Sequence, residues 1–378
     1  MIYFDNAATT FPKPPSVERE MARCMRDYGG NPGRSGHRLS LAAAEAIFDV
    51  RAAIAEFFGI KKPENVVFTV NCTAALNLAI AGIARRGDHF LISDLEHNSV
   101  LRTVANLCRE RGMSFDTFHA LSDDDTLLSE IEKKCKPNTR AVIATHASNI
   151  CPRILPITRI GALCRRLKLL YIVDAAQSAG IYDISVTRDN ISILCAPGHK
   201  GLYGPQGSGF ALFADDFDFA RMSVHTFGGN GKNSAEIDMG REPPDSFEAG
   251  TLPTPAIVGL GEGLRFVRRM GRERIEEQEN RLFLHAGSLL GRIPRVKIYL
   301  PEAQRGSLLL LGFEGIPPTL VAEKLSDHGI CTRAGLHCAP IAHRTLRTGG
   351  DALRISFSAM NTAAEVESFA YILQTLLH

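Results

Sequence analysis

Lys200 lies in a segment whose residue types could bind a carbonyl compound. Residues 195–210 (CAPGHKGLYGPQGSGF) place Lys200 directly after His199 in a glycine-rich loop that follows an apolar run. A lysine at the end of a buried strand is poorly placed for solvent, and buried lysines act as amine nucleophiles. From this segment alone, a surface lysine in a turn is equally consistent. The segment lacks the G-x-x-x-x-G-K-[ST] pattern, which excludes a P-loop.

A carboxylate ends the apolar run in residues 169–180 (LLYIVDAAQSAG). Ligands bind at the carboxyl ends of parallel strands in α/β folds, where Asp174 could pair with a protonated ring nitrogen. Asp174 could instead cap a following helix. Gln177 is as consistent with a capping box as with a ligand contact.

A predicted helix begins after the strand pattern of residues 67–80 (VFTVNCTAALNLAI), at Asn71, Cys72 and Thr73. A helix N-terminus binds phosphate well, although a plain Asn or Thr cap explains the same residues. A lysine for an imine, a carboxylate for a pyridinium nitrogen and a helix start for a phosphate together predict pyridoxal phosphate.

The elements around these segments predict an α/β fold. Strand patterns are expected at 66–70, 89–93, 114–118, 141–145, 169–173, 191–195 and 208–213. Helical patterns separate most of them, at 41–58, 73–84, 99–111, 127–136 and 157–167. This alternation indicates βαβ units and a mostly parallel sheet, and the fully apolar strands indicate that both faces are covered.

The remainder of the chain predicts a second, smaller α+β domain. Residues 227–255 are rich in Gly, Pro and Asn and indicate long loops. One long helical pattern runs from 256 to 291, before strands at 296–300, 307–313 and 353–357 and helices at 319–328 and 363–377. We therefore expect a large domain at 14–255 and a small domain at 256–378, which the N-terminal residues 1–13 join.

Composition excludes several classes of protein. The formal net charge of 378 residues is +2, which gives no basis for binding nucleic acid or an anionic membrane. Apolar runs are too short to span a bilayer, and the N-terminus does not match a signal peptide. Nine cysteines lack the C-x-x-C spacing of a metal or redox motif, so we expect no metal site and a reducing cytoplasm.

Seven segments occur in an order that resembles the class V aminotransferase-like enzymes: FDNAATT, EHNS, THASN, VDAAQSAG, PGHKGLYGPQGSG, FEAGTLPT and RAGLHCAP. The loop R-x-G-x-H-C-A is similar to that of the branch with cysteine desulfurases and selenocysteine lyases. The resemblance covers the whole chain. It implies pyridoxal-phosphate fold type I, with a mostly parallel seven-stranded sheet flanked by helices.

The resemblance also implies a role for each cofactor residue. Lys200 would hold the cofactor covalently, His199 its phosphate, Asp174 its pyridine nitrogen and Gln177 its phenolic oxygen. His97 would stack on the ring, and without the motif it would be a loop histidine. The remaining cofactor residues would be Thr73 and Ala74 at the phosphate, Asn149 beside the ring and the substrate, and Thr251, which would reach the phosphate of the other subunit in a homodimer.

Cys338 would be the catalytic thiol of the implied reaction. L-Cysteine would bind through Arg354, whose planar fork suits a carboxylate and which could otherwise form an internal ion pair. His37 and Arg333 would lie near the substrate, and Arg333 would favour the thiolate of Cys338. That thiolate would take the substrate sulfur as a persulfide and pass it to an acceptor, which could be a protein. The other eight cysteines are expected to be small buried hydrophobes.

The sequence leaves alternatives open. A selenocysteine lyase or another class V aminotransferase-type enzyme would keep the cofactor, although a plain aminotransferase needs no thiol. A nucleotide-binding oxidoreductase would need G-x-G-x-x-G after a strand, which the glycines at 259–263 do not provide. A non-catalytic sulfur-assembly scaffold would be colourless. Pro197 departs from the family's usual Ser or Thr and removes one expected phosphate contact.

Overall fold

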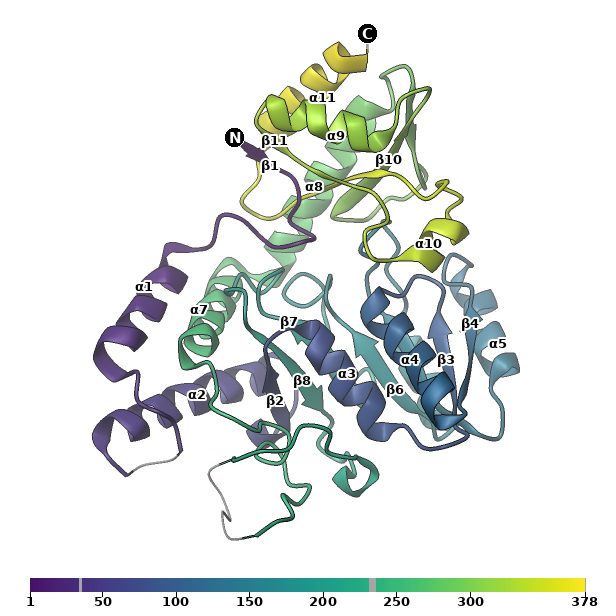
Figure 1. The fold of residues 1–378 in the computed structure, drawn as a ribbon. Helices are drawn as coiled ribbons and strands as arrows, with labels where there is room; N and C mark the ends of the chain where they lie inside the picture. The colour runs from purple at the N-terminus through teal and green to yellow at the C-terminus, as the bar shows by residue number, and fades with distance from the viewer. Residues whose placement is uncertain (34–35, 231–235, 378) are drawn as a thin grey trace.

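The computed structural model describes residues 1–33, 36–230 and 236–377. A seven-stranded sheet lies at the centre of the lower part in Figure 1, in the order β2-β8-β7-β6-β5-β3-β4. Every neighbouring pair is parallel except those that β8 makes with β2 and β7. The expected mostly parallel, seven-stranded sheet is confirmed. Its strands are β2 (Val66–Thr69), β3 (His89–Ser93), β4 (Ser114–Phe118), β5 (Thr139–Thr145), β6 (Leu170–Asp174), β7 (Ile193–Pro197) and β8 (Gly209–Phe213).

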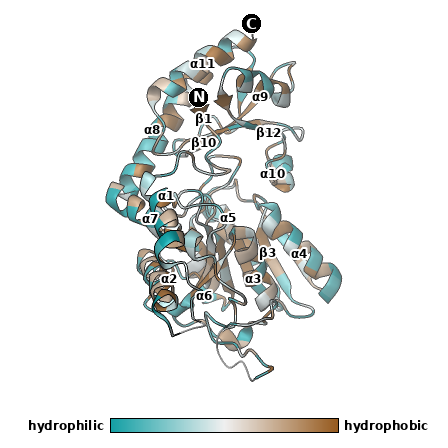
Figure 2. Ribbon diagram, turned by 60° about the vertical axis from the view of Figure 1, so that its left-hand side comes forward, coloured by the Kyte–Doolittle hydropathy of each residue, from teal (hydrophilic) through white to brown (hydrophobic). Residues whose placement is uncertain are grey.

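Helices cover both faces of this sheet, so its strands are apolar on both sides. Along β6, Tyr171 and Val173 belong to one buried cluster and Ile172 to another. The first cluster lies under α2 (Arg38–Phe57), α5 (Asp124–Lys134) and α6 (Ile157–Arg166), and the second under α3 (Cys72–Ile83) and α4 (Asn98–Arg111). Figure 2 shows the hydrophobic strands between helices whose outer sides are more hydrophilic.

A four-stranded sheet in the order β12-β13-β10-β9 forms the upper part of the molecule in Figure 1. It carries a hydrophobic core of its own, which includes Leu309, Ile355 and Phe369. Its strands are β9 (Val296–Ile298), β10 (Leu308–Phe313), β12 (Arg333–Ala334) and β13 (Leu353–Ser356), and its helices are α8 (Arg272–Leu290), α9 (Pro318–Asp327) and α11 (Ala363–Leu377).

The N-terminal segment, residues 1–13, contacts both parts. Strand β1 (Ile2–Tyr3) pairs in parallel with β11 (Ile330–Cys331) in the upper part. Further along, the backbone N–H of Thr10 donates to the carbonyl of His199 (3.1 Å), and the Thr10 hydroxyl donates to that of Lys200 (2.7 Å). The segment therefore connects the upper sheet to the lysine loop of the lower one (Figure 1).

Most expected elements are present, with bounds shifted by one to three residues. The single helix at 256–291 is wrong, because Gly271 adopts φ +86° and separates α7 (Thr254–Met270) from α8. The described residues of 227–253 contain no helix or strand, as expected, and 231–235 lie outside them. Short elements escaped the sequence analysis: α1 (Pro15–Arg23), η1 (Cys24–Tyr28), η2 (Pro63–Asn65), η3 (Phe219–Arg221) and α10 (Pro340–Thr345). Among the described residues, none of the helices has the length and apolarity needed to cross a bilayer.

Candidate active site

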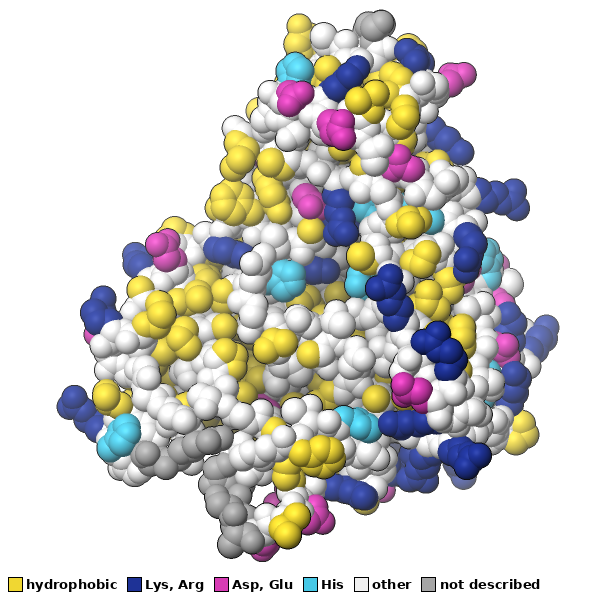
Figure 3. Space-filling model, in the orientation of Figure 1, with side chains coloured by type: hydrophobic (Ala, Val, Ile, Leu, Met, Phe, Trp, Pro, Cys, Tyr) yellow, Lys and Arg dark blue, Asp and Glu magenta, His cyan; other side chains and the backbone are white. Residues whose placement is uncertain are grey.

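A cavity of about 210 Å³ lies at the carboxyl ends of β5, β6 and β7, and Thr145, Asp174 and Pro197 end those strands in its wall. Figure 3 shows a hollow with histidine and basic side chains where the upper and lower parts meet. The cavity brings together nine of the expected site residues: Thr73, His97, Asn149, Asp174, Gln177, His199, Lys200, Arg333 and Arg354.

Lys200 and His199 enter the cavity from the turn after β7. Burial lowers the pKa of the Lys200 amine, which favours its nucleophilic neutral form. The pKa of His199 falls to about 4, first through burial and then through the charges of Lys200 and Lys13. The carbonyl of His199 accepts from the hydroxyl of Thr9 (3.1 Å) and the amine of Lys13 (2.7 Å), so the N-terminal segment holds this turn.

Asp174 is buried at the end of β6, and turns rather than a helix follow it, so it caps no helix. Its Oδ1 accepts from the backbone N–H of Ala176 (2.9 Å) and contacts Sγ of Cys72 at 3.6 Å. Burial, followed by the charge of Asp174, raises the pKa of the Cys72 thiol. Cys72 is thus a neutral thiol in the cavity wall.

The N-terminus of α3 faces the cavity. The side chain of Asn71 accepts from the backbone N–H of Ala74 (2.8 Å), so the Asn cap expected as an alternative is present. Cys72 and Thr73 precede that capped amide, and both line the cavity. The cap does not exclude the expected anion site, because it uses only one of the four free N–H groups at a helix start.

His97 is oriented by hydrogen bonds at the start of α4. Its Nδ1 accepts from the backbone N–H of Ser99 (3.1 Å), so a neutral ring carries its proton on Nε2. Oγ of Ser99 lies 2.8 Å from the same Nδ1 and 2.7 Å from Oγ1 of Thr73. Burial lowers the pKa of His97. The hydrogen bonds therefore fix the orientation of the ring, and the lowered pKa favours its neutral form.

Arg354 reaches the cavity from β13 and is only 1% exposed. One of its nitrogens donates to Asp5 (2.6 Å), and another donates to the backbone carbonyl of Asn149 (2.8 Å). The internal ion pair therefore exists, yet the Nε group has no hydrogen-bond partner among the described residues. Gln177 is tied to the N-terminal segment, because its amide donates to the carbonyl of Ala7 (2.9 Å).

The residues present fit pyridoxal phosphate. Nδ1 of His199 is buried without a hydrogen-bond partner among the described residues, as is Nε of Arg354. A buried carboxylate, Asp174, faces the same space without a lysine or arginine bound to it in the described part of the chain. These groups suit a ligand that has anionic groups and a basic ring nitrogen.

Cys338 is the one exposed cysteine of the nine, as expected. A guanidinium nitrogen of Arg333 lies 3.7 Å from its Sγ. Cys338 lines a groove of about 800 Å³ between α3 and α4 that shares Thr73, His97 and Ser99 with the cavity. Of the other eight cysteines, five are buried, whereas Cys108, Cys135 and Cys331 are half-buried, so full burial of all eight is wrong.

Besides Cys338, three expected residues lie outside the cavity of this chain. His37 is exposed and caps α2, where its Nδ1 accepts from the backbone N–H of Ser40 (3.3 Å). Thr251 and Ala74 line a different cavity of about 500 Å³ beside α3. Their roles stay predictions.

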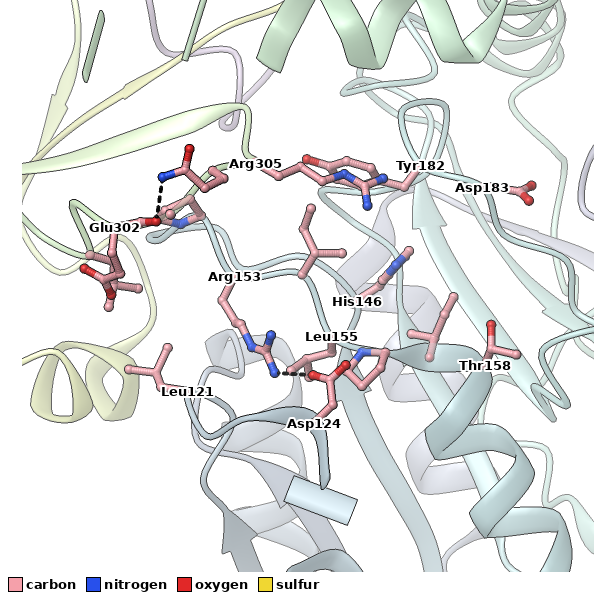
Figure 4. A pocket seen from close by; sticks show the side chains of 17 residues that line it. Leu121, Asp124, His146, Arg153, Leu155, Thr158, Tyr182, Asp183, Glu302 and Arg305 are labelled. Carbon is pink, nitrogen blue, oxygen red and sulfur yellow. Dashed lines mark hydrogen bonds and ion pairs between the residues drawn. The ribbon is translucent and has the colours of Figure 1, made fainter. Parts of the chain in front are cut away.

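A further cavity of about 590 Å³, shown in Figure 4, contains none of the expected site residues. His146, Arg153 and Tyr182 line it beside a loop of the upper part that includes Arg305. Arg153 is fully engaged there with Asp124 and with the carbonyls of Ala120 and Ser122.

Four residues at or beside the cavity were given no role of their own from the sequence. Ser99 belongs to the quoted segment EHNS and Cys72 to the predicted helix start, so their positions are a usable signal. Asp5 and His337 lie in the quoted segments FDNAATT and RAGLHCAP, but only the fold brings them to Arg354 and Asn149.

Comparison with known proteins gives consistent matches. A model of the family described as aminotransferase class-V matches residues 2–369. The chain is 33% identical to a probable cysteine desulfurase of Mycolicibacterium paratuberculosis, over 98% of this chain and 54% of that protein. It is 30% identical to one of Methanothermobacter thermautotrophicus, over 99% and 94%. An apo structure of a cysteine desulfurase from Thermococcus onnurineus NA1 superposes with a TM-score of 0.91 at 33% identity, covering 100% of this chain and 94% of that one.

Proposed function

The chain belongs to the aminotransferase class-V family, and from this premise we propose that it is a pyridoxal-phosphate-dependent cysteine desulfurase. It would take sulfur from L-cysteine onto Cys338 and release L-alanine. The observation that carries the proposal is an exposed thiol in a groove that shares three residues with the Lys200 cavity. A plain aminotransferase needs no such thiol.

The proposed binding roles follow from the contacts around the cavity. When bound, pyridoxal phosphate supplies a pyridinium ring that stabilises negative charge on the α-carbon of an amino acid. Asp174 would hold the proton of the ring nitrogen, and His97 would cover the ring face. The start of α3 and His199 would bind the phosphate. Arg354, with its unpartnered Nε, would bind the substrate carboxylate.

The proposed chemistry needs one base and one nucleophile. Lys200, whose pKa burial lowers, would take the proton from the substrate α-carbon. Sγ of Cys338 would bond to the substrate sulfur while the carbon–sulfur bond breaks. The electron pair of that bond stays with the substrate, whose β-carbon takes up a proton, so that alanine leaves. Arg333 would stabilise the attacking thiolate, and a thiol acceptor, protein or small molecule, would reach the persulfide through the groove.

We also propose that the enzyme is a cytoplasmic homodimer. Thr251 lines a cavity that Lys200 does not line, which supports the expectation that it serves the phosphate of a second subunit. Nine free cysteines favour a reducing compartment.

Purified protein supplied with pyridoxal phosphate should absorb visible light and release sulfide from L-cysteine in the presence of a reductant. Lys200→Ala should remove the visible band and lower the rate by more than about 100-fold. Cys338→Ser should keep the band and lose sulfide release, whereas Cys331→Ser, a nearby half-buried control, should keep both. A coloured Cys338→Ser protein that still releases sulfide would refute the persulfide step.

Selenocysteine is the remaining alternative substrate, because a thiol beside the cavity serves sulfur and selenium chemistry alike. Parallel assays of alanine release from cysteine and from selenocysteine would identify the preferred one.

A further inference from the structure

Two buried histidines lie in and next to the cysteine loop, which we define as residues 335–339. His337 precedes Cys338 in that loop, and His343 lies in α10; each is 2% exposed. Their ring planes are 5° from parallel, and the ring centroids lie 5.5 Å apart. The proposed chemistry uses neither ring, so their burial next to the thiol needs a separate explanation.

The hydrogen bonds fix where each proton of the pair lies. Nε2 of His337 is 3.1 Å from the carbonyl oxygen of Arg333. A carbonyl only accepts, so Nε2 of His337 carries a proton. Nδ1 of His337 is 3.3 Å from Nε2 of His343. A neutral His337 must accept there, which places a proton on Nε2 of His343.

The chain of bonds ends at a hydroxyl. Nδ1 of His343 then accepts from the hydroxyl of Thr348, 2.6 Å away, and that oxygen accepts from the backbone N–H of Gly350 (3.2 Å). Every ring nitrogen is thus satisfied with both imidazoles neutral. With both rings protonated, two N–H groups would face each other across the 3.3 Å contact.

The charges around the pair also favour the neutral state. Burial, followed by the charge of Arg354, lowers the pKa of His337 to about 3. The hydrogen bond to the backbone carbonyl of Arg333 opposes this shift, whereas the charges of His343 and Arg333 add to it. Burial also lowers the pKa of His343, which the charge of Asp351 opposes.

The pair holds a loop whose backbone is otherwise unfavourable. His337 and Cys338 adopt φ values of +49° and +58°, a left-handed conformation that is unfavourable for a non-glycine residue. The lower part of the molecule binds the loop from one side, because Asn149 donates to the carbonyl of His337 (2.8 Å) and the N–H of Asn98 donates to that of Cys338 (2.7 Å).

The ring of His337 adds a further anchor, at Arg333. Its bond goes to the carbonyl of the residue whose guanidinium lies 3.7 Å from Sγ of Cys338. The backbone turn and the cation beside the thiol are therefore held by the same imidazole.

We propose that His337 and His343 are positioning residues, a neutral imidazole pair that sets the place of Cys338 and Arg333 for sulfur transfer. The transfer itself rests on the function proposed above. The pair requires a donor on His343 directed at His337, and neutrality of both rings throughout the working pH range.

The kinetic test compares two substitutions at one position. His343→Leu removes the donor and should lower kcat for sulfide release about tenfold, with KM for L-cysteine within twofold because the cavity is unchanged. His343→Gln keeps a donor in place of Nε2 and should recover kcat to within about threefold of the wild type. His328→Leu, at an exposed histidine after α9, is the control and should have no effect. Equal losses in the Leu and Gln variants would overturn the proposal.

Two readouts do not depend on desulfurase activity. Nitrogen NMR of ¹⁵N-histidine protein should show that the rings assigned to His337 and His343 are neutral, are protonated on Nε2 and do not titrate between pH 8 and pH 5; the His343 signals are assigned by their loss in His343→Gln. Alkylation of Cys338 by iodoacetamide, followed by peptide mapping, should change at least threefold in His343→Leu and less in His343→Gln. A titrating pair, or an unchanged alkylation rate, would refute the positioning role even if the wild type proves inactive toward cysteine.

Discussion

Glu96 is a buried acid next to the proposed catalytic residues, directly before His97. It is 1% exposed, and its Oε1 accepts from the hydroxyl of Ser93 and from the backbone N–H of Thr145 (2.6 Å). Its Oε2 has no partner among the described residues. Burial and then the charge of Asp174 raise the pKa of Glu96 to about 8.

This raised pKa predicts how stability depends on pH. Because the folded state keeps the Glu96 proton up to about pH 8 and an unfolded glutamate loses it near 4.5, the contribution of Glu96 falls as pH rises between those values. The loss would reach up to about 5 kcal/mol at pH 8. Glu96→Gln keeps the acceptor oxygen without the titration, so it should be more stable than the wild type at pH 8 and similar to it at pH 5.

Thermal unfolding of both proteins at pH 5 and pH 8 measures this difference. Glu302→Gln, at an exposed glutamate, is the matched control and should follow the wild type at both values. A wild type that is as stable as Glu96→Gln at pH 8 would contradict a raised pKa.

For single residues, the sequence predicted which side chains could react better than it predicted which side chains are buried. Lys200 and Asp174 could be predicted because each ends an apolar run, and the strand ends then gather at one edge of the sheet. Glu96 and His343 carry no such signal. The environment of Glu96 depends on residues far along the chain, Thr145 and Asp174, and that of His343 on how the cysteine loop folds back onto α10.

Strand β8 passes close to the start of α3, at the proposed phosphate end of the cavity. A Cβ on Gly209 would lie 2.7 Å from the backbone carbon of Asn71 and 3.1 Å from the backbone nitrogen of Cys72. Asn71 caps α3, so these are the atoms that orient the helix start. A glycine here lets the strand pass directly beneath that start.

Gly209→Ala should therefore lower the stability of the fold and, because the clash is with the start of α3, the affinity for the cofactor as well. Overpacking of this kind costs about 1–3 kcal/mol, which would lower the affinity for pyridoxal phosphate by about tenfold or more. Titration of the visible band with pyridoxal phosphate measures it. Gly287→Ala in α8, where an added Cβ meets nothing within 4 Å, is the control, and equal affinities in the two variants would contradict the contact.

Long elements could be predicted from periodicity, and short ones could not. Helix α4 and strand β3 match their expected ranges within a residue, because each repeats one pattern over its length. Strand β1 has two residues and forms only because β11 lies beside it. The expected division between the two domains at 255/256 stays a prediction. Gly271 separates two helices of the expected small domain: α7 packs against α1 and α2 of the expected large domain, whereas α8 packs against α11.

The proposed dimer can be tested by combining two different impaired subunits in one dimer. If Thr251 serves the site of the other subunit, a mixed dimer of Lys200→Ala and Thr251→Val chains contains one site with both residues intact. The two variants can be refolded together or co-expressed to form mixed dimers. Each mixed dimer should then have up to about half of the wild-type activity. Each variant alone should be impaired.

The opposite outcome is equally clear. If Thr251 serves its own subunit, no mixed dimer contains an intact site, and activity would stay at the average of the two variants. A single-subunit mass in solution would exclude the dimer directly.

The N-terminal segment also sets when the site can be completed during synthesis. Asp5 pairs with Arg354, 349 positions later, and β1 needs β11 as its partner. A ribosome releases a chain from its N-terminal end, so residues 1–13 emerge long before β11 and Arg354 and meet the lysine loop of the lower part before these partners. A nascent chain of about 300 residues could assemble the lower sheet and display Lys200, but it would lack the arginine expected to bind the substrate. The enzyme would thus stay inactive until its last strands leave the ribosome.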